Sequence, residues 1–280
     1  MERIGRYQVR QELTVSVFAR LVLAVDEPLD RLVVIKTFAV DPVRPEPPFT
    51  WAEWRRRFIM EGRIQARLTH PNLLGILDSG VLDDGRPYHV LPFMPANLPR
   101  LIGLDLDAAE MAEATEIERP RAMPPAAAMA LLGHLFAALA HLRTQDIVHR
   151  DIKPANILLT RRDNGMAKLC DFGMAKISGS RDIQPGAWIG TLDYISPEQH
   201  EDAGSVTDRS DVYSVGAVAW RMLTGRLPGR LPPPLASFMP DLPQRLADLV
   251  TACLERHPER RPSAQQALRH LLSIGRAEAR

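Results

Sequence analysis

Four side chains in the middle of the chain have the types and spacing needed to handle phosphates and a metal ion. Asp151, Lys153 and Asn156 lie in one short loop, and Asp171 follows after an apolar run. The Asp151 carboxylate can accept a proton from a substrate hydroxyl, and the Lys153 ammonium can neutralise charge on a phosphoryl group in transfer. Asn156 and Asp171 offer the hard oxygen ligands that suit Mg²⁺. The four residues therefore predict a site for phosphates and Mg²⁺.

These residues belong to two motifs with a family likeness. The first is His149-Arg150-Asp151-Ile152-Lys153-Pro154-Ala155-Asn156, and the second is Asp171-Phe172-Gly173. In this order they resemble the catalytic loop and the metal-binding triplet of eukaryotic-like protein kinases. The resemblance extends from about Tyr7 to Leu272. It is nearest in style to bacterial serine/threonine kinases, especially at Ser196-Pro197-Glu198-Gln199.

The resemblance implies a two-lobed α+β protein kinase fold. Residues 1–94 would form an N-lobe with an antiparallel sheet, one main helix and the hinge. Residues 95–280 would form a mostly helical C-lobe, and a single kinase domain would cover about 7–272. A composition of 45% hydrophobic and 25% charged residues is typical of an ordinary globular protein and agrees with this expectation.

Charge, cysteine content and hydropathy narrow the classes of partner. A net charge of +1 gives no electrostatic reason to expect nucleic acid or an anionic membrane. Two cysteines, Cys170 and Cys253, provide no disulfide framework and fit a reducing compartment. No apolar run reaches about 18 residues and no signal peptide opens the chain, so we expect no membrane segment and a cytoplasmic location.

A strand and a helix near the N-terminus are predicted to hold an ion pair. The strand Leu32–Phe38 presents Lys36 on one face, because side chains alternate along a strand. A helix should begin at Thr50, which forms a capping-box pattern with Glu53. Glu61 falls on the apolar face of this helix, where an unpaired carboxylate would be costly. We expect Lys36 to be its partner, and a partly solvated Glu61 is the alternative. In the family, this lysine contacts the ATP phosphates.

The resemblance also assigns a nucleotide site. Family members carry three glycines in the turn between the first two strands, where backbone N–H groups approach the ATP phosphates. Thr14, Ser16 and Ala19 stand at those positions here, so the glycine-rich loop is degenerate; a plain strand-prone hairpin is the alternative. Leu91 would guard the adenine pocket. The full expected set is Leu13, Thr14, Ser16, Leu21, Val34, Lys36, Leu91, Pro92, Met94 and Leu158.

The C-terminal half contains further family-like features. Residues 190–198 resemble the end of an activation segment, which implies a protein substrate. A buried helix is predicted over Ser210–Trp220, because the run is apolar nearly all round. It carries Asp211, which in the family braces the catalytic loop. By the same resemblance, Arg261 should pair with Glu198.

Three segments depart from the ordinary family pattern. Residues 104–122 are acidic and predict a solvated helix or an inserted loop, with a docking surface for a basic peptide as the alternative. Residues 226–240 are short and Pro-rich where the family has a longer docking segment, so recruitment of substrate is either reduced or supplied by a regulatory partner. Between 174 and 190 only Ser178 and Ser180 carry hydroxyls, so we expect activity to depend weakly on phosphorylation there.

The predicted function is that of an ATP-dependent serine/threonine protein kinase. It would transfer the γ-phosphoryl of Mg–ATP to Ser or Thr hydroxyls of protein substrates, with ATP and Mg²⁺ as cofactors. The alternative is a pseudokinase that binds nucleotide or acts as a scaffold, which the missing glycines favour and the complete catalytic set opposes. The resemblance makes Asp151, Lys153, Lys36 and Glu61 the catalytic residues and assigns Mg²⁺ to Asn156 and Asp171.

Overall fold

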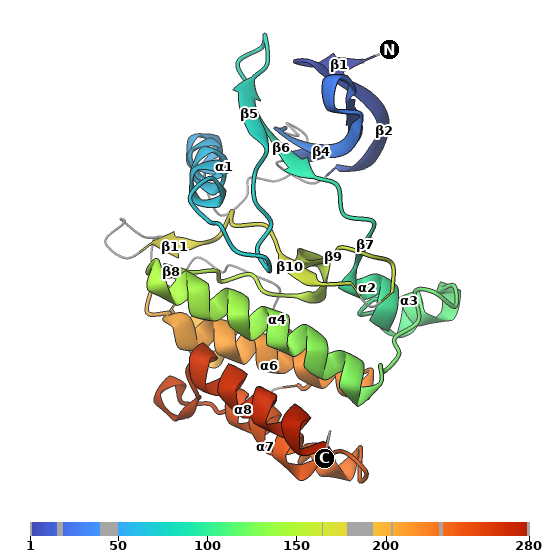
Figure 1. The fold of residues 1–280 in the computed structure, drawn as a ribbon, viewed down its shortest axis with the longest axis vertical. Helices are drawn as coiled ribbons and strands as arrows, with labels where there is room; N and C mark the ends of the chain where they lie inside the picture. Colours follow the sequence, from blue (N-terminus) through green and yellow to red (C-terminus); the bar gives the residue numbers. More distant parts are fainter. Residues whose placement is uncertain are drawn as a thin grey trace. The chain divides into compact units, whose positions relative to one another are not determined.

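The computed structural model describes residues 2–15, 19–39, 50–163, 165–177, 193–202, 204–229 and 232–278, with side chains as far as 275. The chain divides into two compact units, whose elements are labelled in Figure 1. The first unit consists of Met1–Met94 and Asp171–Gly173. The second consists of Pro95–Cys170 and Met174–Arg280. The short segment that contains Asp171 therefore belongs with the first unit, although it lies far along the chain.

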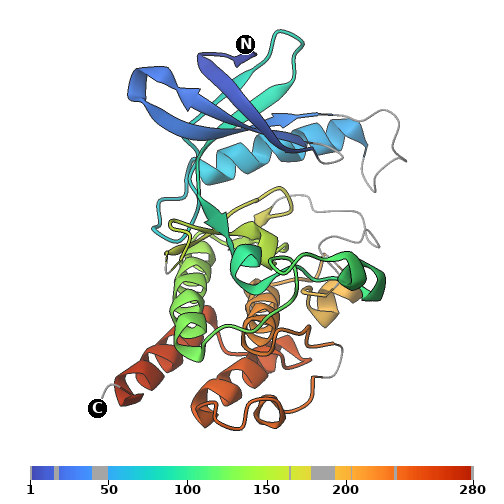
Figure 2. The ribbon, with the colours of Figure 1, turned by 90° about the vertical axis from the view of Figure 1, so that its right-hand side faces the viewer.

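The first unit contains a six-stranded antiparallel sheet with the order β1-β2-β3-β4-β6-β5. One main helix, α1, packs against β6, and Figure 2 shows it running alongside the sheet. These elements confirm the expected antiparallel sheet with a single main helix. Their bounds are β1 (Arg3–Ile4), β2 (Tyr7–Val15), β3 (Ala19–Asp26), a 3₁₀ turn η1 (Glu27–Leu29), β4 (Arg31–Phe38), α1 (Trp51–Gln65), β5 (Asp78–Val81) and β6 (Pro87–Pro92).

The two faces of β4 have different neighbours. Val33 and Ile35 are fully buried in an apolar cluster with side chains from β1, β2, β3 and β6. Because side chains alternate along a strand, Val34 and Lys36 lie on the opposite face. The sequence pattern thus places an apolar core on one face of β4 and its lysine on the other.

Helix α1 begins where the capping pattern predicted. The Thr50 side chain accepts a hydrogen bond from the backbone N–H of Glu53 at 3.3 Å. The helix buries one face, with Trp54, Phe58 and Glu61 all on the buried side. The expected apolar period is therefore present, and a carboxylate lies within it.

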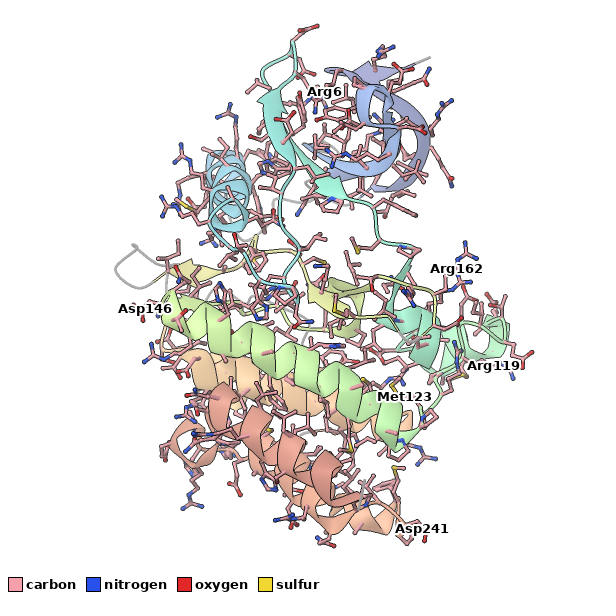
Figure 3. The ribbon with its side chains drawn as sticks, viewed as in Figure 1. Arg6, Arg119, Met123, Asp146, Arg162 and Asp241 are labelled. Atoms are coloured by element: carbon pink, nitrogen blue, oxygen red, sulfur yellow. The ribbon has the colours of Figure 1, made fainter. Side chains whose placement is uncertain are left out.

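The second unit is mostly helical, as the resemblance implied. Helices α4, α6, α7 and α8 pack on one another, and α4 and α6 lie side by side in both ribbon views (Figures 1 and 2). The backbone N–H of Met123, labelled in Figure 3 at the start of α4, donates to the carbonyl of Met222 near the end of α6 at 2.8 Å. The long helices are α4 (Pro125–Thr144), α6 (Asp208–Thr224), α7 (Gln244–Cys253) and α8 (Ala264–Glu278).

Helix α6 has clear signals at both ends. A capping box formed by Thr207 and Ser210 begins it, and Gly225 ends it in the left-handed conformation with φ 71°. The helix is buried over nearly its whole length, from Ser210 to Leu223. The expected buried helix is therefore confirmed, with Asp211 inside its first turn.

Shorter elements connect these helices and carry the loops. Three small strands, β10-β9-β7, form one antiparallel sheet, and β11 pairs with β8. The bounds are β7 (Ala96–Asn97), α2 (Leu98–Ile102), α3 (Ala108–Glu113), β8 (Ile147–Val148), η2 (Pro154–Asn156), β9 (Ile157–Leu159), β10 (Ala167–Leu169), β11 (Lys176–Ile177), α5 (Pro197–Glu201), η3 (Leu235–Ser237) and η4 (Pro258–Arg260).

Helix α4 is, within the described part of the chain, the one helix long and apolar enough to cross a membrane by length and composition. It packs against α6 and α8, and its buried side chains include Leu132, Leu135 and Phe136. Packing in the core of the second unit accounts for this apolar composition, since core helices pass the same test.

Candidate active site

The first unit contains a cluster of one ammonium and two carboxylates. Lys36 Nζ donates to both carboxylate oxygens of Glu61 at 2.8 Å and to Asp171 Oδ1 at 3.2 Å. The Glu61 side chain is 2% exposed, whereas that of Asp171 is 42% exposed. The expected ion pair between Lys36 and Glu61 is present, and the solvated alternative for Glu61 is wrong. Gly173 lets its backbone lie close to the Asp171 carboxylate, because a Cβ at position 173 would lie only 3.3 Å from Asp171 Oδ1.

The electrostatics of this cluster favour an additional cation. Burial disfavours the charged form of Lys36, but the carboxylates of Asp171 and Glu61 outweigh burial and raise the pKa of this lysine. Burial raises the pKa of Glu61 to about 7, while Lys36 lowers it and Asp171 raises it. The single positive charge of Lys36 is therefore shared between the carboxylates of Glu61 and Asp171. A cation bound at the half-exposed Asp171 would relieve the excess negative charge.

The second unit brings together the three polar residues of the catalytic-loop motif. Lys153 Nζ lies 3.1 Å from Asp151 Oδ2. Asn156 Nδ2 donates to the same oxygen at 2.9 Å and to the Asp151 carbonyl at 2.8 Å. The other carboxylate oxygen, Asp151 Oδ1, is buried and has no hydrogen-bond partner among the described residues. This arrangement fixes one oxygen of Asp151 and leaves a well-oriented acceptor on the other.

The backbone of this loop is held in an uncommon conformation. Arg150 has φ 69°, in the left-handed region that costs a non-glycine residue energy. Asp211 stabilises it, since its two oxygens accept the backbone N–H groups of His149 at 2.7 Å and Arg150 at 2.9 Å. Burial raises the pKa of Asp211 and these two N–H groups oppose that rise. The bracing role expected for Asp211 therefore has a direct geometric basis.

His149 connects the loop to the residue before Asp171. Its Nδ1 accepts the backbone N–H of Asp151 at 3.3 Å, and its Nε2 lies 3.1 Å from the carbonyl oxygen of Cys170. These partners fit a neutral ring that donates from Nε2. The imidazole thus links the backbone of the catalytic loop at Asp151 to the backbone of Cys170.

Gln199 is a functional candidate that the sequence reasoning missed. Its Nε2 donates to the Arg150 carbonyl at 2.8 Å, so both backbone polar groups of Arg150 are held by side chains from two helices. Gln199 is buried in α5, directly after the Ser-Pro-Glu run. A glutamine that binds a backbone carbonyl leaves no signature in one sequence. Its place beside that run was the one available signal.

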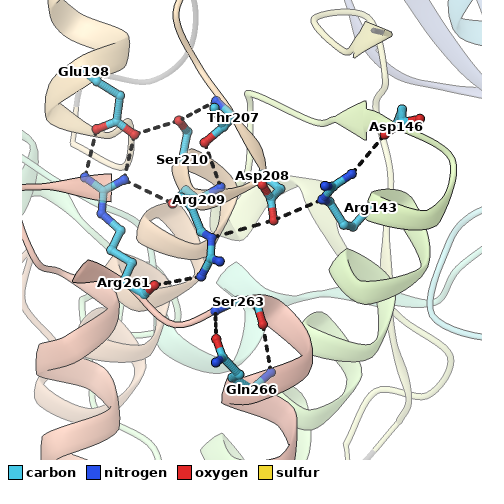
Figure 4. Close-up of polar contacts among 10 residues, drawn as sticks. All are labelled: Arg143, Asp146, Glu198, Thr207, Asp208, Arg209, Ser210, Arg261, Ser263 and Gln266. Atoms are coloured by element: carbon cyan, nitrogen blue, oxygen red, sulfur yellow. Dashed lines mark hydrogen bonds and ion pairs between the residues drawn. The ribbon is translucent and has the colours of Figure 1, made fainter. Parts of the chain in front are cut away.

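The helix that carries Gln199 is fixed by a buried ion pair, drawn in Figure 4. Arg261 binds Glu198 through two parallel contacts, Nη1 to Oε1 at 2.6 Å and Nη2 to Oε2 at 2.8 Å. The five N–H donors of Arg261 are all used, because three backbone carbonyls accept the rest. Burial would raise the pKa of Glu198, but hydrogen bonds from Arg261 and Ser210 lower it below its ordinary value. The expected pair is confirmed.

The strand residues of the expected nucleotide site share one face of the sheet. Residues directly opposed in an antiparallel ladder lie on the same face. Leu21 opposes Lys36, and Val34 opposes Leu91, so these four side chains line the face that carries the lysine. Pro92 is the last residue of β6, and Leu158 and Met94 are half-buried.

The glycine-loop positions lie around the β2–β3 turn. Leu13 and Thr14 are exposed in β2, and Ala19 is buried at the start of β3. Ser16 lies outside the described residues, as do Ser178 and Ser180. The consequence of the missing glycines for nucleotide affinity therefore stays a prediction.

Comparison with known proteins identifies the family. The profile of the family described as protein kinase domain matches residues 7–272. The serine/threonine-protein kinase PksC of Streptomyces coelicolor is 35% identical over 93% of this chain and 47% of its own length. PrkC of Bacillus subtilis, also a serine/threonine-protein kinase, is 33% identical over 80% of this chain and 31% of its own length. The DNA damage-responsive serine/threonine-protein kinase RqkA of Deinococcus radiodurans is 31% identical over 98% and 40%.

The chain spans less than half the length of these three relatives. The family match nevertheless spans residues 7–272, nearly the whole of this chain, and Lys36 is paired with Glu61, Asp211 with the catalytic loop and Arg261 with Glu198. With this agreement between sequence match and geometry, the chain belongs to the protein kinase domain family.

Proposed function

We propose that this domain is a serine/threonine protein kinase, which transfers the γ-phosphoryl group of Mg–ATP to Ser or Thr hydroxyls of protein substrates. The names of the bacterial relatives support the choice of Ser and Thr as acceptors. The complete set of catalytic side chains supports an enzyme over a pseudokinase.

The observation that carries the proposal is the state of the Asp151 carboxylate. One oxygen is engaged by Lys153 and Asn156, whereas the buried Oδ1 has no partner among the described residues. A buried acceptor without a partner is costly, and a substrate hydroxyl would relieve that cost by donating to it. Asp151 then orients the attacking hydroxyl and accepts its proton, while Lys153 balances charge on the transferring group.

Mg²⁺ fits the donors that the motif supplies. The Asp171 carboxylate and the Asn156 amide oxygen are hard ligands, and the negative excess around Lys36 favours a cation at Asp171. When bound, the ion neutralises charge on the phosphates of ATP. Lys36, held by Glu61, would contact the α- and β-phosphates. MgATP binding is therefore assigned to these four residues.

The remaining nucleotide contacts follow the sheet face described above. We assign the adenine pocket to Leu21, Val34, Leu91 and Leu158, with backbone groups of Pro92 and Met94 at the adenine edge. Leu13, Thr14 and Ser16 would lie over the phosphates, where hydroxyls replace two of the family's glycines. This degenerate loop lowers the expected affinity for ATP and leaves the chemistry to the other residues.

A regulatory partner and a cytoplasmic location are also part of the proposal. In the segment 226–240, the described residues form only the short turn η3, and Phe238 is 43% exposed while its ring contacts Trp220 edge-on at 5.7 Å. The shortness of this docking region supports recruitment of substrate by a partner. The two free cysteines, Cys170 and Cys253, support a reducing compartment.

Transfer of label from γ-labelled ATP tests the proposal. Wild-type protein should transfer label to Ser or Thr in the presence of Mg²⁺ and not in EDTA, and Asp151→Asn should abolish transfer. Asp146→Asn is the matched control, because Asp146 is an exposed aspartate with φ 52° whose carboxylate binds the exposed Arg143 (Figure 4). ATP binding without transfer by the wild type would instead identify a pseudokinase.

A further inference from the structure

The acidic segment that departs from the family pattern forms a closed loop, residues 103–121, which we call the acidic excursion. Its ends are joined by backbone hydrogen bonds, Leu104 N–H to the Glu118 carbonyl and Arg121 N–H to the Ile102 carbonyl, both at 2.8 Å. Gly103 has φ 77°, and a Cβ there would collide with the Arg119 carbonyl; Figure 3 labels Arg119. The excursion is therefore a folded element, and we call the place where its two ends are hydrogen-bonded, at residues 102–104 and 118–121, its neck.

Arg221 of α6 holds this neck. Its Nη2 donates to the carbonyls of Ile102 at 3.2 Å and Leu104 at 3.0 Å, and its Nε donates to Asp105 Oδ1 at 2.5 Å. The Arg221 side chain is 1% exposed, so its charge is balanced by Asp105 away from most solvent. The first acidic residue of the excursion is thus a counter-ion of the core helix, whereas Glu110, Glu113 and Glu116 are exposed as expected.

The second oxygen of Asp105 binds a different element. Tyr194 donates its hydroxyl to Asp105 Oδ2 at 2.6 Å. Tyr194 is buried, and burial together with Asp105 raises the pKa of its phenol, which stays a hydrogen-bond donor. A hydrogen bond to a carboxylate at this length is of the strong, charge-assisted kind.

Tyr194 is the second residue of the segment 193–199, whose last residue, Gln199, contacts the catalytic loop. Ile195 and Ser196 are buried after it, α5 follows, and Gln199 in α5 donates to the Arg150 carbonyl. We propose that Asp105 is a positioning residue for the catalytic loop. It fixes the start of 193–199 through Tyr194, and this positions Gln199 for its hydrogen bond to the carbonyl of Arg150, the residue before Asp151. That the hydrogen bond from Gln199 to Arg150 affects turnover rests on the proposed kinase function.

Tyr194→Phe is the decisive variant, because it removes one hydroxyl and leaves the ion pair between Asp105 and Arg221 in place. We expect kcat with casein as acceptor to fall about tenfold, as for loss of one buried hydrogen bond to a charged group, and KM for ATP to change less than about twofold. Asp105→Asn should lower kcat at least as much, because it also removes the ion pair with Arg221. The double variant should be no worse than Asp105→Asn alone, because the contact between Tyr194 and the Asp105 carboxylate is already weakened there.

Tyr7→Phe is the matched control. Tyr7 is equally buried and donates to Asp78 Oδ2 at 2.8 Å in the first unit, so its loss weakens a comparable contact away from the catalytic loop. It should leave kcat unchanged. Unchanged kcat in Tyr194→Phe, an equal loss in Tyr7→Phe, or multiplicative losses in the double variant would each overturn the proposal.

Amide hydrogen exchange separates this proposal from the kinase function. In Tyr194→Phe, the peptide that covers 149–156 should exchange about tenfold faster, whereas Tyr7→Phe should leave it unchanged. Faster exchange in a protein without transfer activity would support the positioning contact and refute the proposed function. Unchanged exchange in an active kinase would refute the positioning contact alone.

Discussion

Gly62 lies in the last turn of α1 beside the buried ring of His89, and replacing it by alanine should destabilise the protein. On helix propensity alone, Gly62→Ala would stabilise by about 1 kcal/mol. A Cβ at this position, however, would collide with the imidazole, since it would lie 2.9 Å from both ring nitrogens. The sign of the effect therefore depends on whether the ring can move away.

The imidazole is held on two sides. It stacks on Phe58 with ring centroids 4.4 Å apart, and its Nε2 lies 2.8 Å from the Phe58 carbonyl. Overpacking at such a rigid site costs about 1–3 kcal/mol, which exceeds or cancels the gain in propensity. We expect Gly62→Ala to lower the free energy of unfolding by up to about 2 kcal/mol.

A double-mutant cycle provides the assay. His89→Ala removes the ring, and in that background Gly62→Ala should stabilise by about 1 kcal/mol, because only helix propensity remains. The free energies would be measured by urea unfolding of the four proteins. Stabilisation of the wild-type background by the full propensity value would refute the reasoning. Gly62→Ala should also weaken the ion pair between Glu61 and Lys36, since Glu61 is next to Gly62 in α1.

Three further predictions concern pH, the glycine-loop positions and the buried ion pair. Burial lowers the pKa of His89 below 6.5, so the stability it contributes is present above 6.5 and lost as pH falls through the lower folded value; urea unfolding should show this loss in wild type and not in His89→Gln. Replacing Thr14, Ser16 and Ala19 together by Gly should lower KM for ATP, and an unchanged or raised KM in steady-state kinetics would contradict a simply degenerate loop. Glu198→Gln leaves a buried guanidinium without its counter-ion and should cost about 3–5 kcal/mol in unfolding experiments, whereas a loss below 1 kcal/mol would show that the pair is not needed.

The parts of the site that could be predicted from the sequence are those with local patterns or motif residues. The pair of Lys36 and Glu61 followed from a strand period, a helix period and the cost of an unpaired buried carboxylate. The pair of Arg261 and Glu198 followed from motif likeness. In each case, both partners were visible as chemically distinctive residues.

The rest depends on contacts between segments distant in the sequence. Gln199 binds a backbone carbonyl, which has no sequence signature. Asp105 stands among other acidic residues and differs from them only because Arg221 and Tyr194 lie beside it in the fold. Gly62 is an unfavourable residue in a helix, but the reason for it, the nearby ring of His89, depends on how β6 packs against α1.

The central claim is that Asp171 holds Mg–ATP while Asp151 acts on the acceptor hydroxyl. The most direct measurement is Mg²⁺-dependent ATP binding by calorimetry, with single-turnover transfer measured on the same Asp171→Asn and Asp151→Asn proteins. Asp171→Asn should lose Mg²⁺-dependent binding, and Asp151→Asn should bind normally and transfer no label. Wild-type transfer by Asp151→Asn, or unaltered Mg²⁺-dependent binding by Asp171→Asn, would contradict the account.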